Sequence, residues 1–492
     1  DVWVGAPVNR AVERGIAYAY RLGADGAVQA PERLQLDVVT PTDDFGARIH
    51  TRGGITAVVA AGMHRNAGAV YVYERAPDGA LRTTATLVSP SDAMPAITGA
   101  ERRCTDGMAG PFACSDVELM AFIPNSMLAV DGRNRGIRLN DNWGWTDPES
   151  GREYAIVGRT DGTAFVDITD PLNPVLVADL PQPEGSPPSP TWRDMKVYRN
   201  HAYIVADAAG EHGIQVFDMT RLRTIRDRPA LVEADARYTG INSAHNIVIN
   251  EESGFGYVVG ASGGGETCAG GLHMVDLREP KNPQFAGCFA HEGTGRAGRG
   301  YTHDAQCVNY RGPDTRYTGR EICLSSNENS LSVADVTDKQ DTRALAVARY
   351  PNPGYTHQGW FSEDHHYFFV DDEGDLLAGN VATTRTTVWD LKDLEDPILV
   401  NEFMGSMPAS AHNQYVKGNY IYQANYRYGL HILDITDPAN PREAGHFDTA
   451  PYLEGAGFSG AWSNYPFFRS GNVIVTSVQE GLFVLKPRRP VF

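Results

Sequence analysis

Apolar and polar residues alternate in short runs along most of this chain, and turn-forming residues separate the runs. One pattern recurs seven times, an apolar strand that ends in an acidic turn, as in AFVDITDPLNP from Ala164 and HILDITDPANP from His431; the last copy, LFVLKP from Leu482, is truncated. The aspartates that close the other copies lie 44 to 59 residues apart: Asp167, Asp218, Asp276, Asp335, Asp390 and Asp434. A period of about 50 residues is typical of one supersecondary unit that is repeated.

The unit around His412 shows what is repeated. The run HNQYVKGN is followed by YIYQANYR, GLHILDIT and REAGHFDT, and Gly, Asn and Pro residues mark the turns between them. Four short antiparallel strands joined by tight turns are typical of one blade of a β-propeller. Corresponding units start near Asn142, Trp192, Ala244, Thr302, Thr356, Ala411 and Ala461. The pattern therefore predicts an all-β fold, a seven-bladed β-propeller of four-stranded antiparallel blades.

The last unit lacks one strand. It ends at Lys486-Pro487 after three strands, and a blade left in that state would expose a sheet edge. The run VELMAFIP, Val117–Pro124, lies just before the first blade and resembles an outer strand. We expect this strand to pair with the last blade and close the ring, so that the propeller spans residues 101–492.

Residues 1–100 carry a different repeat. WVGAPVNRAVERGIAYAYRL and VVAAGMHRNAGAVYVYER are two copies of one pattern, separated by DDFGARI. Through Gly5-Ala6-Pro7, Phe45-Gly46 and the strands ending at Tyr20 and Tyr73, this segment resembles the FG-GAP repeat of integrin-type propellers. The resemblance implies a small N-terminal β module. The chain starts in the middle of a unit, so we expect the module to be incomplete at its N-terminus. A DxDxDG calcium loop, frequent in that repeat, does not occur in it.

The larger region resembles a known family. CTDGMAGPFACSDVELMAF, LNDNWGWTDPESGREYAIVGRTDGTAFVDITDP and YTHDAQCVNYRGPDTRYTGREIC are similar in content and order to the choice-of-anchor B family, whose propeller is built from LVIVD repeats. The resemblance covers about four-fifths of the chain. It implies a secreted or surface-held bacterial or archaeal protein and carries no settled activity. The family is named for varied C-terminal anchors, whereas this chain ends at Val491-Phe492 without an anchor helix or sorting motif.

Charge and cysteine content narrow the class of protein. The net charge of −18 disfavours nonspecific binding to nucleic acid or anionic lipid, and no apolar run reaches the length of about 20 residues that a transmembrane helix needs. The six cysteines fall into three local pairs, which favours disulfides. The alternative is a zinc site, but the sequence contains no CxxC motif. Disulfides imply an oxidising compartment, so we expect an extracellular, cell-surface or periplasmic location. The expected disulfides are Cys104–Cys114, Cys268–Cys288 and Cys307–Cys323.

Histidine recurs at the start of the units. The first strand of each propeller blade lines the central channel, so these side chains and their neighbours are expected to converge on the axis. Neutral imidazoles are common ligands for transition metals, although a repeated histidine can also hydrogen-bond the backbone of a neighbouring blade. The candidate metal ligands are His245, His303, His357 and His412. Further expected channel-lining residues are Arg193, Asp194, Asp304 and Trp462.

The densest acidic cluster is a second candidate site. It consists of Asp371, Asp372, Glu373 and Asp375. Hard cations such as Ca²⁺ bind several carboxylate and carbonyl oxygens on one loop, whereas the alternative is a solvated acidic turn. A bound cofactor would therefore be a transition metal in the channel or calcium in this loop.

Neither the motifs nor the resemblance define an activity. No GxSxG elbow, P-loop or HExxH motif occurs. We expect a secreted or cell-surface scaffold that binds a protein or glycan partner. The alternatives are a metal-dependent enzyme, hydrolytic or redox, with its site in the channel, and a structural subunit of an extracellular assembly.

Overall fold

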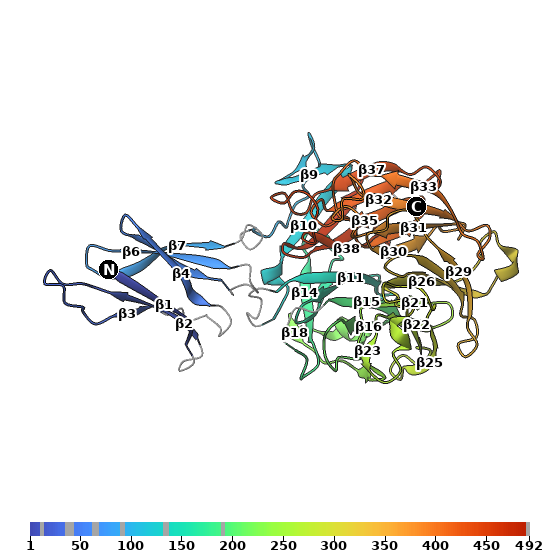
Figure 1. Cartoon of the computed structure of the whole chain (residues 1–492), viewed down its shortest axis with the longest axis horizontal. Coiled ribbons are helices and arrows are strands. Elements are labelled where there is room, and N and C mark those ends of the chain that lie inside the picture. Colours follow the sequence, from blue (N-terminus) through green and yellow to red (C-terminus); the bar gives the residue numbers. More distant parts are fainter. Residues whose placement is uncertain are drawn as a thin grey trace. The chain divides into compact units, whose positions relative to one another are not determined.

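The computed structural model describes residues 1–9, 14–34, 44–61, 68–88, 94–130, 137–187 and 192–488. They divide into two compact units, one formed by Asp1–Pro95 with Asp131–Ile137 and the other by Ala96–Val130 with Arg138–Phe492 (Figure 1). Strands dominate both units, which confirms the all-β prediction. The helices of the described residues are short 3-10 turns: η1 (Asn125–Met127), η2 (Met219–Thr224), η3 (Cys268–Gly270) and η4 (Thr315–Tyr317). In the described part of the chain, no helix is long and apolar enough to cross a membrane.

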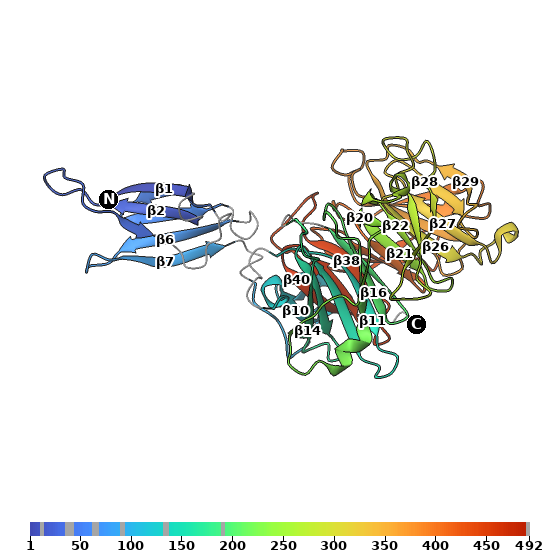
Figure 2. The same ribbon diagram turned by 90° about the horizontal axis from the view of Figure 1, so that it is seen from below.

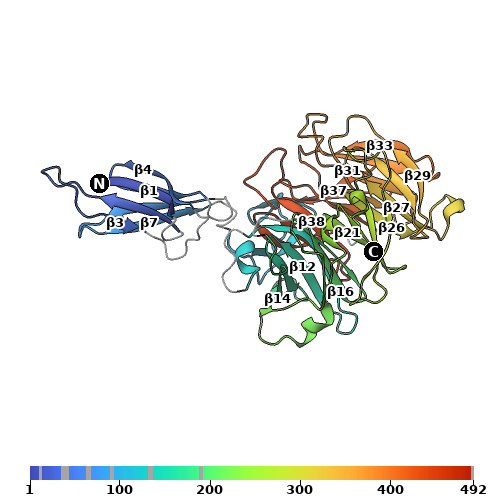
Figure 3. The same ribbon diagram turned by 60° about the horizontal axis from the view of Figure 1, so that its bottom comes forward.

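The smaller unit contains two antiparallel sheets (Figure 3). The first contains β1 (Val2–Asn9), β2 (Arg14–Tyr20) and β3 (Glu32–Leu34), and the second contains β4 (Phe45–Arg52), β5 (Ile55–Ala60), β6 (Ala69–Arg75) and β7 (Leu81–Val88). A small apolar core that includes Ala17, Phe45, Val58 and Tyr73 lies between them. A Cβ atom on Gly5 of β1 would lie 2.1 Å from the carbonyl oxygen of Gly46 in β4, so only glycine allows these backbones to approach.

The larger unit repeats one four-stranded antiparallel sheet, and its colours follow the sequence around a common centre in Figure 1. The innermost strands are β11 (Leu139–Thr146), β15 (Arg193–Tyr198), β21 (Asn246–Asn250), β26 (Asp304–Asn309), β30 (Thr356–Phe361), β34 (Gln414–Lys417) and β38 (Ala461–Tyr465). Each contacts the next in this order, and β38 contacts β11. The fold is therefore β-propeller-like, with the innermost strands surrounding an axis.

The other strands complete each sheet outward. The second strands are β12 (Glu153–Arg159), β16 (His201–Ala206), β22 (Phe255–Val259), β27 (Glu321–Ser326), β31 (Tyr367–Asp372), β35 (Tyr420–Ala424) and β39 (Val473–Ser477). The third strands are β13 (Gly162–Asp167), β17 (Ile214–Asp218), β24 (Leu272–Asp276), β28 (Leu331–Asp335), β32 (Arg385–Asp390), β36 (Leu430–Asp434) and β40 (Gly481–Pro487). The outer strands are β14 (Val175–Pro181), β19 (Ala236–Tyr238), β25 (Gln284–Phe289), β29 (Arg343–Ala348), β33 (Ile398–Met404), β37 (Arg442–Phe447) and β10 (Val117–Pro124).

Several short strands extend these sheets. β18 (Ala230–Leu231) adds in parallel to β14, β9 (Phe112–Ser115) adds to β37, and β8 (Met108–Ala109) pairs with β9. β20 (Ile241–Ser243) and β23 (Ser262–Gly264) form a two-stranded ribbon. The additions on β14 and β37 cover outer edges that would otherwise expose unpaired backbone groups.

The last sheet combines strands from both ends of the larger unit. β10 pairs antiparallel with β40, with Val117 opposite Pro487 and Pro124 opposite Gly481 (Figure 2). Phe122 of β10 contacts Phe483 of β40, with ring centroids 4.6 Å apart, and both rings are fully buried. The outer position of this sheet is thus filled by a segment that precedes all the innermost strands of the unit in the sequence.

The repeated aspartates close the third strands. In each of six sheets the final residue of the third strand is an aspartate, and its carboxylate accepts a hydrogen bond from the backbone N–H two residues later. Such a bond stabilises the turn that leads to the outer strand, because the side chain satisfies a backbone donor that leaves the sheet. The recurring aspartates are therefore structural.

The three disulfides join the expected partners: Cys104–Cys114, Cys268–Cys288 and Cys307–Cys323. Cys307 and Cys323 lie directly opposite each other on β26 and β27. Disulfides of this kind are typical of proteins that fold in oxidising compartments.

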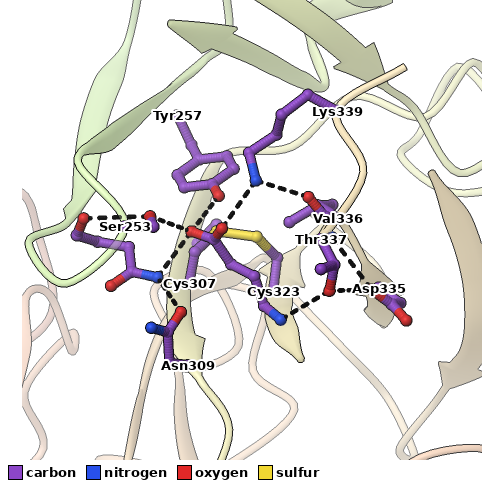
Figure 4. The surroundings of a disulfide bond; sticks show 12 residues. Ser253, Tyr257, Cys307, Asn309, Cys323, Asp335, Val336, Thr337 and Lys339 are labelled. Carbon is purple, nitrogen blue, oxygen red and sulfur yellow. Dashed lines mark hydrogen bonds and ion pairs between the residues drawn. A yellow bond between two sulfur atoms is a disulfide. The ribbon is translucent and has the colours of Figure 1, made fainter. Parts of the chain in front are cut away.

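A buried carboxylate beside the third disulfide connects two sheets (Figure 4). Glu321 of β27 accepts hydrogen bonds from Asn250, Ser253 and Tyr257 of the preceding sheet. Its other oxygen lies 2.7 Å from Nζ of Lys339. Because each oxygen has a partner, the charge of Glu321 is compensated although the residue is only 5% exposed.

Candidate functional site

The innermost strands present corresponding residues at three levels along the axis. The first level lies within two residues of the start of each strand and consists of Asn140, Arg193, His245, His303, His357, His412 and Trp462. The second follows one residue later and consists of Asp141, Asp194, Asn246, Asp304, Gln358, Asn413 and Ser463. The third is three residues after the first and consists of Trp143, Lys196, Val248, Gln306, Trp360, Tyr415 and Tyr465. A strand rises about 3.3 Å per residue, so the first and third levels are roughly 10 Å apart.

The four first-level histidines form a continuous row. The ring centroids of His245 and His303 are 4.2 Å apart, those of His303 and His357 4.4 Å, and those of His357 and His412 4.4 Å. The row ends on Trp462, whose ring centroid is 4.4 Å from that of His412. The structure therefore places the four candidate ligands side by side, in chain order, at one level of the axis.

In each of the four histidines, Nδ1 faces a fixed oxygen. Nδ1 of His303 lies 3.0 Å from the backbone oxygen of His357, and Nδ1 of His412 donates to the backbone oxygen of Trp462. Nδ1 of His245 lies 2.9 Å from a carboxylate oxygen of Asp207, and Nδ1 of His357 lies 3.4 Å from Asp371. Three of these contacts join neighbouring sheets, as expected for a purely structural role. They also leave Nε2 as the available nitrogen of His245, His303 and His412, whereas Nδ1 of His357 makes no hydrogen bond with any described residue.

Burial keeps most of this row neutral. Burial and then the neighbouring rings hold the pKa of His303 and of His412 well below the ordinary value, and burial also lowers the pKa of His357. His245 differs: burial alone would lower its pKa, but Asp207 raises it above the ordinary value. Neutral imidazole is the form that binds metal ions.

Glu373 joins two of the histidines to form a three-residue group. It follows β31 and places Oε1 3.7 Å from Nε2 of His412. His357, Glu373 and His412 each offer a ligand atom, and the three atoms lie within 4.8 Å of one another. Glu373 also accepts a hydrogen bond of 2.6 Å from the hydroxyl of Tyr426. The side chain of Glu373 is 18% exposed, so the group is reached from solvent on this side.

The other acidic residues of that loop have protein partners. Asp372 accepts hydrogen bonds from the backbone N–H groups of Gly354, Tyr355, Gly374 and Asp375. Asp375 lies 2.9 Å from Nε of Arg385, and Asp371 accepts from the N–H of Gln358. The four acidic residues are therefore divided between separate contacts: Glu373 lies beside Nε2 of His412, and Asp371 lies beside Nδ1 of His357.

A network of charges occupies the second level. Nζ of Lys196 lies 2.5 Å from Asp194, and Asp141 accepts a hydrogen bond of 2.8 Å from Asn413. Burial, followed by the neighbouring charge of Asp194, raises the pKa of Asp304 to about 7 and that of Asp141 well above its ordinary value. Although burial alone would lower it, these carboxylates hold the pKa of Lys196 above its ordinary value. One lysine thus balances a group of acids inside the ring.

Arg193, predicted to line the channel, is almost fully buried and makes structural contacts. Its Nε donates to the backbone oxygen of Arg159, and Nη1 lies 2.7 Å from Nε2 of His212. Nη2 donates to Gln182. It occupies the position that histidine has in four other sheets and connects its own sheet to the preceding one.

Aromatic residues surround a cavity of about 440 Å³ at the third level. Trp143, Trp360 and Tyr465 from three innermost strands line it together with Phe467 and Lys196. The rings of Trp143 and Tyr465 have centroids 5.0 Å apart, and Nζ of Lys196 lies 4.6 Å above the ring of Trp143. Polar residues also line the cavity: Asn250, Glu251, Glu252, Asn309 and Arg311.

Sequence reasoning did not single out Asp141, Lys196 or this cavity. The sequence did contain one signal for these residues. They lie at fixed distances along the chain from the first-level positions, and all three levels recur once per unit. The residue types vary at the third level, however, so only the alignment of the strands brings Trp143, Lys196 and Trp360 together.

One match with a known family agrees with a repeat architecture. Residues 409–449 match the LVIVD repeat family. No curated protein matches the chain. Similar solved structures include a hydrazine synthase from Kuenenia stuttgartiensis, 11% identical with a TM-score of 0.47, covering 69% of this chain and 93% of that one. A protein from Lactobacillus plantarum is 12% identical with a TM-score of 0.44, covering 69% and 88%, and a functionally unknown protein from Desulfotomaculum acetoxidans is 11% identical with a TM-score of 0.44, covering 69% and 94%.

Proposed function

We propose that this chain is a secreted or cell-surface binding protein of the choice-of-anchor B type. In this proposal the larger unit is a seven-bladed propeller and the smaller unit an FG-GAP-like module. The cyclic contacts of the innermost strands and the pairing of β10 with β40 support the blade number. The three disulfides support the extracellular or periplasmic location. A repeat propeller-like fold suits a scaffold or binding role, but the site must define the ligand.

The observation that carries the ligand class is the aromatic cavity at the third level. Its volume of about 440 Å³ lies in the range of small-molecule sites. The partly exposed rings of Trp143 and Trp360 offer flat apolar faces, and acidic and amide side chains lie around them. A sugar ring combines an apolar C–H face with hydroxyl groups that donate and accept hydrogen bonds, so this cavity suits a glycan unit.

Saccharide titrations monitored by tryptophan fluorescence test this function. We expect an oligosaccharide from a panel of microbial and plant glycans to shift the emission. Trp360→Ala should weaken its binding about fivefold, because a ring that stacks on the ligand is worth about 1 kcal/mol. Trp192→Ala is the matched control: this exposed tryptophan contacts Trp462 at the first level and should change the affinity less than twofold.

Two results would contradict the glycan proposal. One is a panel in which no saccharide binds, and the other is a saccharide that binds Trp360→Ala as tightly as the unchanged protein. A protein ligand that competes for the cavity would instead support the scaffold role without a glycan.

A metal-dependent enzyme is a second candidate function, favoured by the grouping of His357, His412 and Glu373. The described residues provide ligand atoms for an ion but do not define a substrate beside it. A structural subunit of an extracellular assembly is a third candidate, in which the smaller unit makes the contact.

A further inference from the structure

The two histidines nearest Glu373 differ in how their second ring nitrogen is held. Metal-bound histidines donate their second ring N–H to a carbonyl or carboxylate, which fixes the ring and directs the other nitrogen to the ion. Nδ1 of His412 makes such a bond to Trp462, whereas Nδ1 of His357 lies 3.4 Å from Asp371 and makes no hydrogen bond in the described part of the chain. In the described residues, Nε2 of His357 accepts and donates no hydrogen bond, and Nε2 of His412 faces Glu373 alone.

The third ligand comes from the loop after β31. Glu373 places a carboxylate oxygen beside Nε2 of His412, and the hydroxyl of Tyr426 holds that carboxylate in position. This hydrogen bond is the type of outer contact that orients a ligating carboxylate. Two imidazoles and one carboxylate on one side of an ion leave further coordination positions open, as in centres of the 2-His-1-carboxylate type.

We propose that His357, His412 and Glu373 bind one first-row divalent transition metal ion, such as Zn²⁺, Co²⁺ or Fe²⁺. The ligand atoms lie within 4.8 Å of one another, a spacing that small side-chain rotations contract around one ion. His303, whose ring centroid is 4.4 Å from that of His357, flanks the site, and its Nε2 is a fourth nitrogen in the same row. Ligands of this kind favour transition metals over Ca²⁺, which takes oxygen ligands.

The site lies at the opposite end of the innermost strands from the aromatic cavity. It does not rest on the proposed glycan function. The described residues contain a second group of potential ligands close enough to share one ion: Glu266, Cys268 and Cys288. It is unsuitable because its two cysteines form a disulfide.

The test uses the full chain after treatment with a chelator. Zn²⁺ titration by calorimetry should show one ion per chain, and Co²⁺ should produce visible absorption bands. Glu373→Gln should weaken Zn²⁺ binding by about tenfold or more, because it removes the charge but keeps the size and the Tyr426 contact. His357→Ala and His412→Ala should each weaken binding by about 100-fold or more, because each removes a ligand atom.

Two controls separate this site from general histidine binding. His366→Ala removes a partly buried histidine paired with Asp390, and His245→Ala removes the far end of the row. Both should keep Zn²⁺ affinity within about threefold of the unchanged protein. Circular dichroism of the metal-free variants checks folding, and Glu373→Gln decides the outcome if a histidine variant does not fold.

The proposal fails if the unchanged protein takes up neither Zn²⁺ nor Co²⁺. It also fails if Glu373→Gln and His412→Ala each bind one Zn²⁺ as tightly as the unchanged protein does. Glycan binding measured on the same metal-free protein tests the aromatic cavity separately. The failure of one proposal therefore does not affect the test of the other.

Discussion

Asp147 and Asp304 are both buried carboxylates, yet their surroundings move their pKa values in opposite directions. Burial and Asp194 raise the pKa of Asp304 to about 7. Burial would raise the pKa of Asp147 as well, but hydrogen bonds from Arg223 and Ser150 lower it to about 2. The difference depends on the partner: Asp304 faces other acids, whereas Asp147 faces a guanidinium group.

The contact between Asp147 and Arg223 predicts a pH-dependent stability. Because the folded-state pKa of Asp147 lies below the ordinary value of 3.8, its ionised form stabilises the fold above about pH 4. That contribution disappears as the pH falls through about 2. We expect Asp147→Asn to lower the free energy of unfolding by about 1–3 kcal/mol at pH 7, measured by denaturant titration.

The difference in the free energy of unfolding between Asp147→Asn and the unchanged protein should become smaller as the pH falls from about 4 to about 2. Asp227→Asn changes an exposed aspartate. Its free energy of unfolding should stay within about 0.5 kcal/mol of that of the unchanged protein at every pH. A gap that is constant with pH would show that the ion pair does not carry the effect.

Residue spacing predicted part of the candidate site. The histidines recur once per unit, and this alone placed His245, His303, His357 and His412 at one level. Glu373 was found only as part of an acidic run, because its approach to His412 depends on the loop after β31 and not on the repeat. Asp141 escaped notice because its partner Asn413 belongs to another sheet, and Lys196 because the residue types vary from unit to unit at its position.

At the scale of single elements, a polar network helps join neighbouring sheets. Glu321 of β27 binds Tyr257 of β22 and Asn250 of β21, and Lys339 balances its charge. Removing one partner of a buried ion pair leaves the other charge without compensation, which costs more than removing both.

Glu321→Gln should therefore be strongly destabilising. We expect a loss of about 3–5 kcal/mol in the free energy of unfolding, because the ammonium group of Lys339 remains buried without its partner. The double variant Glu321→Gln/Lys339→Met should regain part of this loss. Denaturant titration of the three proteins measures this recovery, and Glu252→Gln on an exposed pair with Arg311 is the control. A double variant less stable than Glu321→Gln would contradict the prediction.

Strand ends were predictable where a side chain determines them. The six repeated aspartates mark the last residues of third strands, because each carboxylate binds the backbone two residues later. Added strands such as β18 and β9 were not predicted. They are short and contribute few apolar residues, so no periodic pattern indicates them.

At the scale of the whole molecule, the ring of the larger unit depends on one contact between distant segments. Phe122 of β10 packs on Phe483 of β40, and Phe112 and Phe447 complete the aromatic cluster. Each of these rings is fully buried. The sequence indicated the missing strand because the last copy of the repeat is incomplete, whereas the aromatic cluster required the register of β10 on β40.

Phe122→Ala should weaken this closure. Removing a buried phenylalanine leaves a cavity and typically costs about 3–5 kcal/mol, so we expect a lower midpoint for thermal unfolding of the larger unit by calorimetry. Phe285→Ala, on a side chain that is 47% exposed, should leave the midpoint nearly unchanged. Equal effects of the two substitutions would mean that the contact of β10 with β40 does not limit stability.

The pairing of β10 with β40 also sets an order of events during protein synthesis. A ribosome makes residues 117–124 more than 350 residues before it makes Gly481–Pro487. Until then the apolar side chains of β10 lack their final neighbours, and the circle stays open while the intervening sheets form one after another. Strand β10 therefore waits for its partner during synthesis, and the larger unit can close only after the ribosome has made β40.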